Sequence, residues 1–216
     1  MTATFLKSAN TVIVLDFETT GLSPDLGDRA IEIGAVKIEQ GVVVDQFQGL
    51  MNPGRRISGF IEDYTGITNT MLKTAPSCGE VMTAFADFAG GADLVAHNAS
   101  FDKRFLHAEL ERVKRQCSGE FACSMLVARR IYQQAENHKL GTLVEHANIP
   151  NDGTFHRALA DAQMTARLWL KMVDHLSDNH RIEHVSFSLM QKLSSTPKNA
   201  VKRFLQKYTS KQPINC

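Results

Sequence analysis

The sequence lacks any apolar run long enough to cross a membrane, and its N-terminus lacks the charged, then apolar, then small-residue order of a signal peptide. The four cysteines form no C-x-x-C pair, which argues against a zinc knuckle or a redox pair and favours free thiols in a reducing compartment. The formal net charge is only +1, so a nucleic-acid partner would have to be engaged by a local patch. These absences make a cytoplasmic protein with no membrane partner the default expectation.

The feature that is present near the N-terminus is a strand that ends in carboxylates. Four branched apolar residues, Val12 to Leu15, predict a strand buried on both faces. Because side chains alternate along a strand, Asp16 and Glu18 should share one face while Phe17 takes the other. Two neighbouring anions at the edge of a core repel each other and are costly to desolvate, and a bound Mg²⁺ or Mn²⁺ would remove both costs. A lone Asp-x-Glu is also typical of a strand that runs into a polar turn, so this interpretation requires partners elsewhere.

The rest of the chain predicts a meander followed by crossover helices. Strands are expected over residues 30–38 and 42–51, joined by a hairpin turn at Gln40-Gly41. This order predicts an α/β protein with a mixed five-stranded sheet and helices on both faces. The later elements expected are short helical turns within 57–74, a helix over 79–89, a strand over 94–96, a helix over 101–115, a strand over 121–123, helices over 125–133 and 140–146, a loop over 151–154 and a long helix over 157–176.

Two later segments supply candidate partners for the carboxylates. Asp102 falls in the first turn of a helix that directly follows a short strand, where the helix dipole would also stabilise a purely structural carboxylate. His156 and Asp161 would lie about 140° apart on one helix, so they can share a pocket only if His156 precedes the helix. The polar stretch before His156 favours that arrangement. Ala158 and Ala162 keep the helix face small, which would allow it to approach the first strand closely.

Three segments together carry a family resemblance. Asp16-Phe17-Glu18, the segment from His97 to Asp102 and the segment from His156 to Asp161 occur in this order. They resemble the three exonuclease motifs of the DEDDh family of 3′→5′ exonucleases, which includes the proofreading subunit of bacterial DNA polymerase III and oligoribonucleotide- and tRNA-trimming enzymes. The resemblance runs from about Thr11 to Met172.

The resemblance implies a ribonuclease H-like fold and a two-metal mechanism. Two divalent cations, Mg²⁺ or Mn²⁺, would be held by four carboxylates, and His156 would accept the proton of the attacking water. The resemblance assigns the terminal nucleotide to the segment after the first carboxylate pair, with Leu22 as a wedge against bases. Phe101 resembles a pocket aromatic, and a core role explains it equally well. The metal ligands implied are Asp16, Glu18, Asp102 and Asp161, and the substrate-binding residues implied are Thr19, Thr20, Gly21, Leu22, Thr65, Asn98 and Phe101.

The sequence departs from the family pattern at three places. Phe60 stands where many relatives carry a Glu that contacts the terminal sugar, and Thr65 replaces a His of the polymerase III subunit. Cys123-Ser124 replaces a frequent Asp-Thr pair after the fifth strand. None of these changes removes an implied metal ligand, but together they leave sugar selectivity open.

The motifs divide the chain into an exonuclease domain over residues 8–176 and a C-terminal helical appendage over 177–216. The appendage should contain helices over 185–193 and 198–208, the second of which has an apolar face and a basic face. It could dock on the domain, contact phosphates or bind a polymerase or repair partner. The basic residues are Lys198, Lys202, Arg203, Lys207 and Lys211.

The sequence therefore predicts a metal-dependent 3′→5′ exonuclease. It should release nucleoside 5′-monophosphates from single-stranded 3′ ends, with DNA favoured over RNA. The alternative is an exonuclease-fold adaptor that acts mainly by docking on a polymerase or repair complex. The presence of His156 argues against the adaptor, because docking does not require a general base.

Overall fold

The computed structural model describes residues 7–150 and 156–210, and its centre is a mixed five-stranded sheet in the order β3-β2-β1-β4-β5. Strands β1, β2 and β3 form an antiparallel meander, while β4 is parallel to β1 and β5 is parallel to β4. The predicted mixed sheet is confirmed. The strands are β1 (Val12–Thr19), β2 (Ala30–Glu39), β3 (Val42–Leu50), β4 (Leu94–Ala96) and β5 (Phe121–Cys123).

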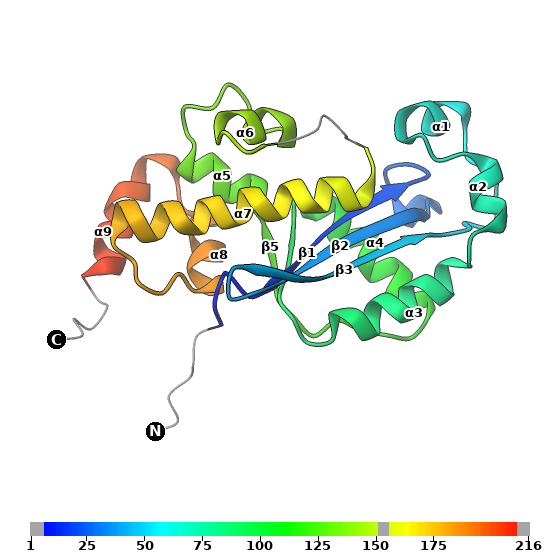
Figure 1. Ribbon diagram of the computed structural model, residues 1–216, viewed down its shortest axis with the longest axis horizontal. Helices are drawn as coiled ribbons and strands as arrows, with labels where there is room; N and C mark the ends of the chain where they lie inside the picture. Colours follow the sequence, from blue (N-terminus) through cyan, green and yellow to red (C-terminus); the bar gives the residue numbers. More distant parts are fainter. Residues whose placement is uncertain (1–6, 151–155, 211–216) are drawn as a thin grey trace.

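Helices cover both faces of this sheet, as predicted. The long helix α7 lies across one face together with α5, α6 and α8, and α3 and α4 cover the other (Figure 1). The helices are α1 (Gly59–Thr65), α2 (Asn69–Thr74), α3 (Cys78–Ala89), α4 (Ser100–Arg112), α5 (Ser124–Ile131), α6 (Leu140–His146), α7 (Ala158–His180), α8 (Phe187–Ser195) and α9 (Val201–Thr209).

Three segments differ from the sequence prediction or escape it. A 3₁₀ turn over Pro24–Leu26 lies in the predicted polar loop between β1 and β2. Helix α7 continues past residue 176 to His180, where Arg181 adopts a left-handed backbone conformation with φ of 53° and ends it. The predicted loop at 151–154 lies outside the described residues.

Side chains alternate along β1, so they divide between two cores on opposite faces of the sheet, and Asp16 and Glu18 fall on the face covered by α7. Val14 belongs to the core on the α7 side of the sheet, while Leu15 and Phe17 belong to the core against α3 and α4. Asp16 and Glu18 continue the Val14 row and meet α7. The predicted shared face of the two carboxylates is therefore confirmed.

Close contact between α7 and the sheet depends on small residues on both sides. Ala158 and Ala162 are fully buried, as predicted for a helix that approaches the sheet closely. On β2, Gly34 pairs with Asp16, and a Cβ built on Gly34 would overlap the backbone of Ala158 and Leu159. Only glycine fits at this position, because the first turn of α7 occupies the space that a side chain would need.

The C-terminal segment is helical, as predicted, and packs against α7. Phe187, Leu193 and Leu205 lie in the same core as the α7 face of the sheet. The chain near Ser8 forms a β-bridge with Ser186, so residues from both ends of the described chain meet there. The division into two units at residue 176 stays a prediction.

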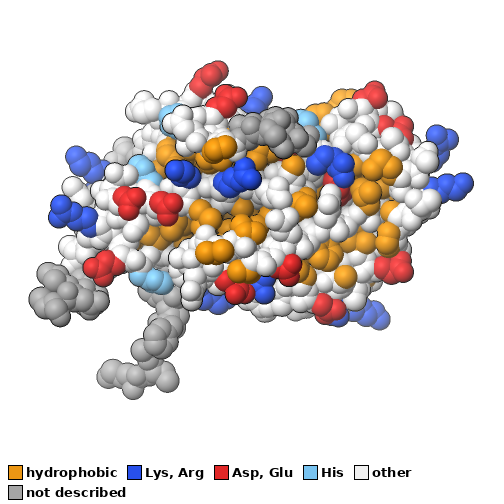
Figure 2. All heavy atoms as spheres, in the orientation of Figure 1, with side chains coloured by type: hydrophobic (Ala, Val, Ile, Leu, Met, Phe, Trp, Pro, Cys, Tyr) orange, Lys and Arg blue, Asp and Glu red, His pale blue; other side chains and the backbone are white. Residues whose placement is uncertain are grey.

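The surface combines charges of both signs with apolar patches. On the face shown in Figure 2, Lys and Arg side chains are interspersed with Asp and Glu, in keeping with a net charge of +1. Cys78, Cys117 and Cys123 are free thiols. Within the described ranges, no helix has the combination of length and apolar composition that crossing a bilayer demands.

Candidate active site

A cavity of about 680 Å³ opens where β1 and β4 end, between α1, the start of α4 and the start of α7. Parallel strands commonly place ligand sites at their carboxyl ends, because loops and helix starts converge there. Every residue of the site predicted from the sequence lines this cavity: Asp16, Glu18, Thr19, Thr20, Gly21, Leu22, Thr65, Asn98, Phe101, Asp102, His156 and Asp161.

Three of the four predicted metal ligands form a compact acidic cluster. Carboxylate oxygens of Asp16, Glu18 and Asp161 lie within 4.8 Å of one another, close enough for one cation to bind all three. Asp102 lies outside this group but beside it, because its Oδ1 accepts a hydrogen bond of 3.2 Å from the backbone N–H of Phe17. The structure thus brings together carboxylates from β1, α4 and α7.

The carboxylates of the cavity carry negative charge at a cost. Burial, followed by the charge of Asp161, raises the pKa of Glu18 to about 8. Burial raises the pKa of Asp102 to about 7, and burial with the neighbouring carboxylates raises the pKa of Asp16 well above its ordinary value. The pKa of Asp161 is also raised by burial, although backbone hydrogen bonds partly oppose the shift. A divalent cation would relieve both desolvation and repulsion, and a set of carboxylate oxygens suits Mg²⁺ or Mn²⁺.

Glu32 was not among the site residues predicted from the sequence, but it fixes the start of α7 against β2 beside the site. It is completely buried on β2, pairs across the sheet with Glu18 and accepts hydrogen bonds from Arg157 Nε and Nη2 at 3.2 and 2.9 Å. It also accepts a hydrogen bond of 3.1 Å from the backbone N–H of Ala158, one of the unpaired donors at the start of α7. The available signal was a charged residue inside the apolar run of β2.

His156 lies before α7, as the prediction required. Its φ of 63° is left-handed, its side chain is exposed, and its backbone N–H donates a hydrogen bond of 3.0 Å to Asp161 Oδ2. Its ring lies against Tyr64 on α1, with the ring centroids 4.1 Å apart. Phe60 lies behind Tyr64, with ring planes 11° from parallel and centroids 5.9 Å apart. Tyr64 was missed, and the only signal was its spacing of four residues from Phe60 on a short helix.

The segment after the carboxylate pair is braced by hydrogen bonds of its own. Thr19 Oγ1 donates to the carbonyl oxygen of Gly21 at 2.6 Å, and Thr20 Oγ1 donates to Asp28 Oδ1 at 3.1 Å. A Cβ on Gly21 would collide with the carboxylate of Asp28. Leu22 is 78% exposed at the cavity. The segment therefore presents an apolar side chain on a fixed turn.

The other predicted substrate-binding residues meet the cavity in different ways. Thr65 is buried and its hydroxyl donates to the carbonyl oxygen of Ile61 at 2.8 Å. Asn98 is exposed, with a left-handed φ of 61°. Phe101 lines the cavity and packs against Phe105 with centroids 4.9 Å apart, so it combines the pocket role and the core role that the sequence left open.

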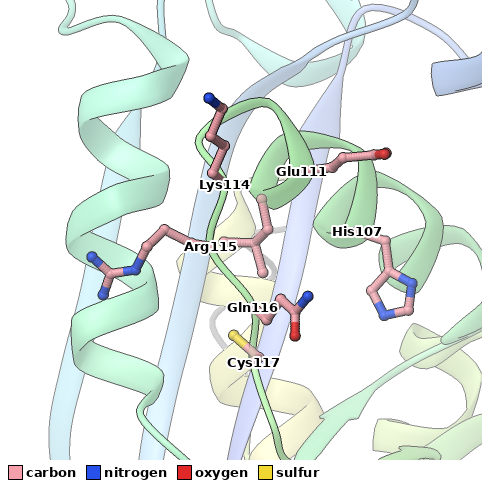
Figure 3. Close-up of a pocket in the computed structure, with 7 residues that line it drawn as sticks. His107, Glu111, Lys114, Arg115, Gln116 and Cys117 are labelled. Atoms are coloured by element: carbon pink, nitrogen blue, oxygen red, sulfur yellow. The ribbon is translucent and has the colours of Figure 1, made fainter.

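A second hollow of similar size lies at the end of α4 and shows no comparable convergence. It has a volume of about 650 Å³, and its side chains point apart (Figure 3). Arg115 reaches toward α3, where it pairs with Asp87, while His107 points to the opposite side. Of these two hollows, the one at the end of β1 therefore has the groups for hydrolytic chemistry.

The sequence pattern of exonucleases of the RNase T type matches residues 13–169, which include the four carboxylates and His156. The chain belongs to this exonuclease family. The chain is 41% identical over 166 residues to the PolC-type DNA polymerase III of Caldanaerobacter subterraneus subsp. tengcongensis, covering 77% of this chain and 12% of the polymerase. It is 36% identical over 208 residues to the PolC-type enzyme of Thermotoga maritima, covering 95% of this chain and 14% of that polymerase. The chain thus spans a small part of these relatives.

Solved structures place the domain in the ribonuclease H-like exonuclease fold. Exonuclease X in complex with 5′-overhanging duplex DNA superimposes with a TM-score of 0.67 and 25% identity, covering 85% of this chain and 99% of that one. The nuclease domain of 3′hExo, a DEDDh family member bound to rAMP, gives a TM-score of 0.66 at 20% identity, covering 79% and 94% of the two chains. The expected fold is thereby confirmed, and the family match over residues 13–169 confirms the exonuclease resemblance of the sequence.

Proposed function

We propose that this exonuclease domain removes nucleotides from the 3′ ends of single-stranded nucleic acid, DNA in preference to RNA, and releases nucleoside 5′-monophosphates. The observation that carries the proposal is the cluster of Asp16, Glu18 and Asp161, whose oxygens lie within 4.8 Å of one another in the cavity that His156 also lines. A cluster of acids alone would repel a phosphodiester. A cation bound to these acids reverses that sign.

The four carboxylates fit a pair of divalent cations, Mg²⁺ or Mn²⁺, held by Asp16, Glu18, Asp102 and Asp161. Such cations, when bound, supply Lewis acidity and positive charge toward a phosphodiester. His156 takes a proton from the attacking water, and the water oxygen bonds to phosphorus as the bond between phosphorus and the 3′ oxygen breaks. The 3′ oxygen of the shortened strand takes up a proton from solvent, and the terminal nucleotide leaves as a 5′-monophosphate. The hydrogen bond from the backbone of His156 to Asp161 ties the base to one of the metal ligands.

The preference for single strands is supported by the exposed apolar side chain at the cavity. Leu22 projects into solvent beside a polar site, where an unstacked terminal base would cover it. Preference for DNA is supported by the similarity to PolC-type DNA polymerases and to Exonuclease X, whose solved complex contains DNA. A second candidate role is docking on a polymerase or repair complex, which is favoured because the matched relatives are polymerases many times longer than this chain.

The deciding assay follows 5′-end-labelled single-stranded DNA, duplex DNA and RNA of equal length, each with Mg²⁺ or Mn²⁺. We expect stepwise shortening from the 3′ end, fastest for single-stranded DNA, with 5′-monophosphates as products. Asp16→Asn, which keeps the shape of the side chain, is the matched control and should be inactive. Hydrolysis that continues in excess chelator, or that persists in Asp16→Asn, would contradict the metal-dependent mechanism.

A further inference from the structure

Helix α1 brings an aromatic side chain against the histidine of the site. The ring centroids of Tyr64 and His156 lie 4.1 Å apart, with the ring planes inclined by 40°. This separation is van der Waals contact between the two rings. Tyr64 is 51% exposed, so its packing does not serve the protein core. The ring instead covers one side of the imidazole.

The position of Tyr64 is fixed independently of His156. Helix α1 begins at the cap Ser58, whose side chain accepts from the N–H of Ile61, and ends at Gly66 in a left-handed conformation with φ of 69°. Glu62 of the same helix accepts a hydrogen bond from the backbone N–H of Asn69 at the start of α2. The tyrosine therefore sits on an element anchored at both ends.

His156, in contrast, sits on backbone outside any helix or strand. It precedes α7, has a left-handed φ of 63° and is exposed. Its backbone N–H is held by Asp161, but that bond leaves the side-chain torsions free. Among the described residues, Tyr64 is the aromatic ring that contacts the imidazole.

We propose that Tyr64 is a positioning residue that holds the imidazole of His156 in the orientation required for proton transfer. The inference rests on the proposed function, in which His156 is the general base. A base must lie within hydrogen-bond reach of the proton that it takes, and small misplacements are costly. Tyr64 achieves this by covering one face of the ring, so the aromatic surface is the part that matters and the hydroxyl group is dispensable.

A competing role for Tyr64 is stacking on a substrate base. In this structure the imidazole lies against one face of the tyrosine ring, so a base could stack on that face only by displacing His156. The two roles predict different kinetics. A positioning residue should change kcat, whereas a base-stacking residue should mainly change KM.

The first test reads the contact without activity. In the metal-free protein, NMR signals of the His156 ring protons should carry a ring-current shift from Tyr64. Tyr64→Leu should move these signals toward ordinary imidazole positions, and Tyr64→Phe should leave them shifted. Tyr132→Leu is the matched control, because Tyr132 contacts His146 and His175 with centroids at 5.4 and 5.9 Å and does not line the cavity. Signals of His156 that do not move in Tyr64→Leu would overturn the proposal.

The second test is kinetic. Tyr64→Leu should lower kcat by about 10- to 100-fold, within the cost of small misplacements of a catalytic group, and leave KM nearly unchanged. Tyr64→Phe should restore the rate, and Tyr132→Leu should not alter it. In a His156→Ala background, Tyr64→Leu should cause no further loss, because the group that it positions is gone. A full additional loss in that background, or an effect confined to KM, would overturn the positioning role.

The outcomes also separate this inference from the proposed function. A protein without nuclease activity, or a His156→Ala variant with an unchanged rate, would refute His156 as the base and with it any catalytic role for Tyr64. If Asp16→Asn and His156→Ala lower kcat as expected but Tyr64→Leu leaves kcat unchanged, the proposed function stands and only the positioning role is refuted.

Discussion

Carboxylates are withdrawn from solvent in two kinds of place in this protein. Glu32 and Glu109 are paired with arginines, whereas the carboxylates of the cavity are not. Glu109 is 1% exposed and accepts two hydrogen bonds from Arg29 Nε and Nη2, at 2.8 and 2.9 Å. Glu32, fully buried, is paired in the same bidentate manner with Arg157. At the cavity, Asp16 has no such partner among the described residues, and its nearest charged neighbours are other acids.

The difference shows that this fold places an arginine beside a buried carboxylate at two positions but not at the cavity. Each paired glutamate also accepts from a backbone N–H, of Ala30 for Glu109 and of Ala158 for Glu32, so each fastens two elements together. The pKa values of the cavity carboxylates are raised, and no ion pair among the described residues includes them; the charge of Arg157 lowers the pKa of Glu18 without offsetting the rise. A charge that the chain does not supply must come from a ligand, which is the physical case for a cation here.

The largest effect should come from making the cavity less acidic. Asp16→Asn should reduce turnover by about 10³-fold or more, because several kcal/mol of charge stabilisation at the phosphate are lost. The same change should raise the melting temperature of the metal-free protein at pH 8 by a few degrees, since it removes a half-buried charge that neighbouring acids repel. Turnover and melting in chelator measure the two effects. A variant that loses both activity and stability would show that Asp16 is a structural residue.

Breaking a paired carboxylate should have the opposite effect on stability. Glu32→Gln and Glu109→Gln should each cost roughly 1–3 kcal/mol of unfolding free energy, the usual price of a disrupted buried hydrogen-bond network. Only Glu32→Gln should also lower turnover of the folded enzyme, because Arg157 and Ala158 adjoin His156 at the start of α7. Denaturant unfolding and specific activity of the folded fraction check this pair. Equal losses of activity in both variants would remove the special role of Glu32.

The carboxylates of the cavity could be predicted from the sequence, whereas the pairing of Glu32 with Arg157 could not, for a physical reason. Alternation along β1 is a local property, so it predicted that Asp16 and Glu18 share a face. The bond between Glu32 and Arg157 joins residues 125 positions apart, and no local periodicity encodes it. Family motifs marked the ligands because the motifs contain them.

Two other features could not be predicted because they exist only in three dimensions. The requirement for glycine at Gly34 arises from the backbone of α7, which is more than a hundred residues away along the chain. The contact of Tyr64 with His156 depends on where the seven-residue helix α1 sits against the cavity. In contrast, the order of strands and crossover helices was readable because each element has its own periodicity.

Changing pH should sharpen the contrast between the two regions. Unfolded carboxyls titrate near 4, whereas the pKa of Asp102 is raised to about 7 and that of Glu18 to about 8. The folded metal-free protein therefore binds more protons than the unfolded chain between these values. The contribution of these groups to stability should therefore be highest below about pH 4, fall as pH rises from about 4 to 8, and level off above pH 8.

Melting temperatures across this range, with chelator and with Mg²⁺ or Mn²⁺, test the prediction. The cation should raise the melting temperature by several degrees at pH 8 and by less at pH 6, because binding requires ionised ligands. In Asp16→Asn the slope with pH should be shallower. A metal-free protein that becomes more stable between pH 6 and 8 would mean that other groups dominate.

The smallest effect should come from the cations of α9. They are unpaired like the acids of the cavity, but they are exposed and carry the opposite charge. Lys202, Arg203 and Lys207 are exposed, and no ion pair in the described residues includes them. The apolar face of the same helix is docked, with Leu205 only 2% exposed. Helix α9 lies at the opposite end of the molecule from α1 (Figure 1), and residues of α1 line the cavity. These positions favour a docked helix over one that contacts substrate near the site.

We therefore expect replacement of Lys202, Arg203 and Lys207 by Gln to leave both the melting temperature and the salt dependence of single-strand binding unchanged, when binding is measured in the inactive Asp16→Asn background. Each lost phosphate contact would lower the log–log salt slope by about 0.7, so three contacts would lower it by about 2, which is readily measured on long strands. Leu205→Ala is the matched change on the other face, and it should cost roughly 2–5 kcal/mol of unfolding free energy with no change in the slope. A reduced slope in the triple Gln variant would instead assign α9 to nucleic-acid binding. It would show that these cations, which do not stabilise the fold, contact phosphates of the bound strand.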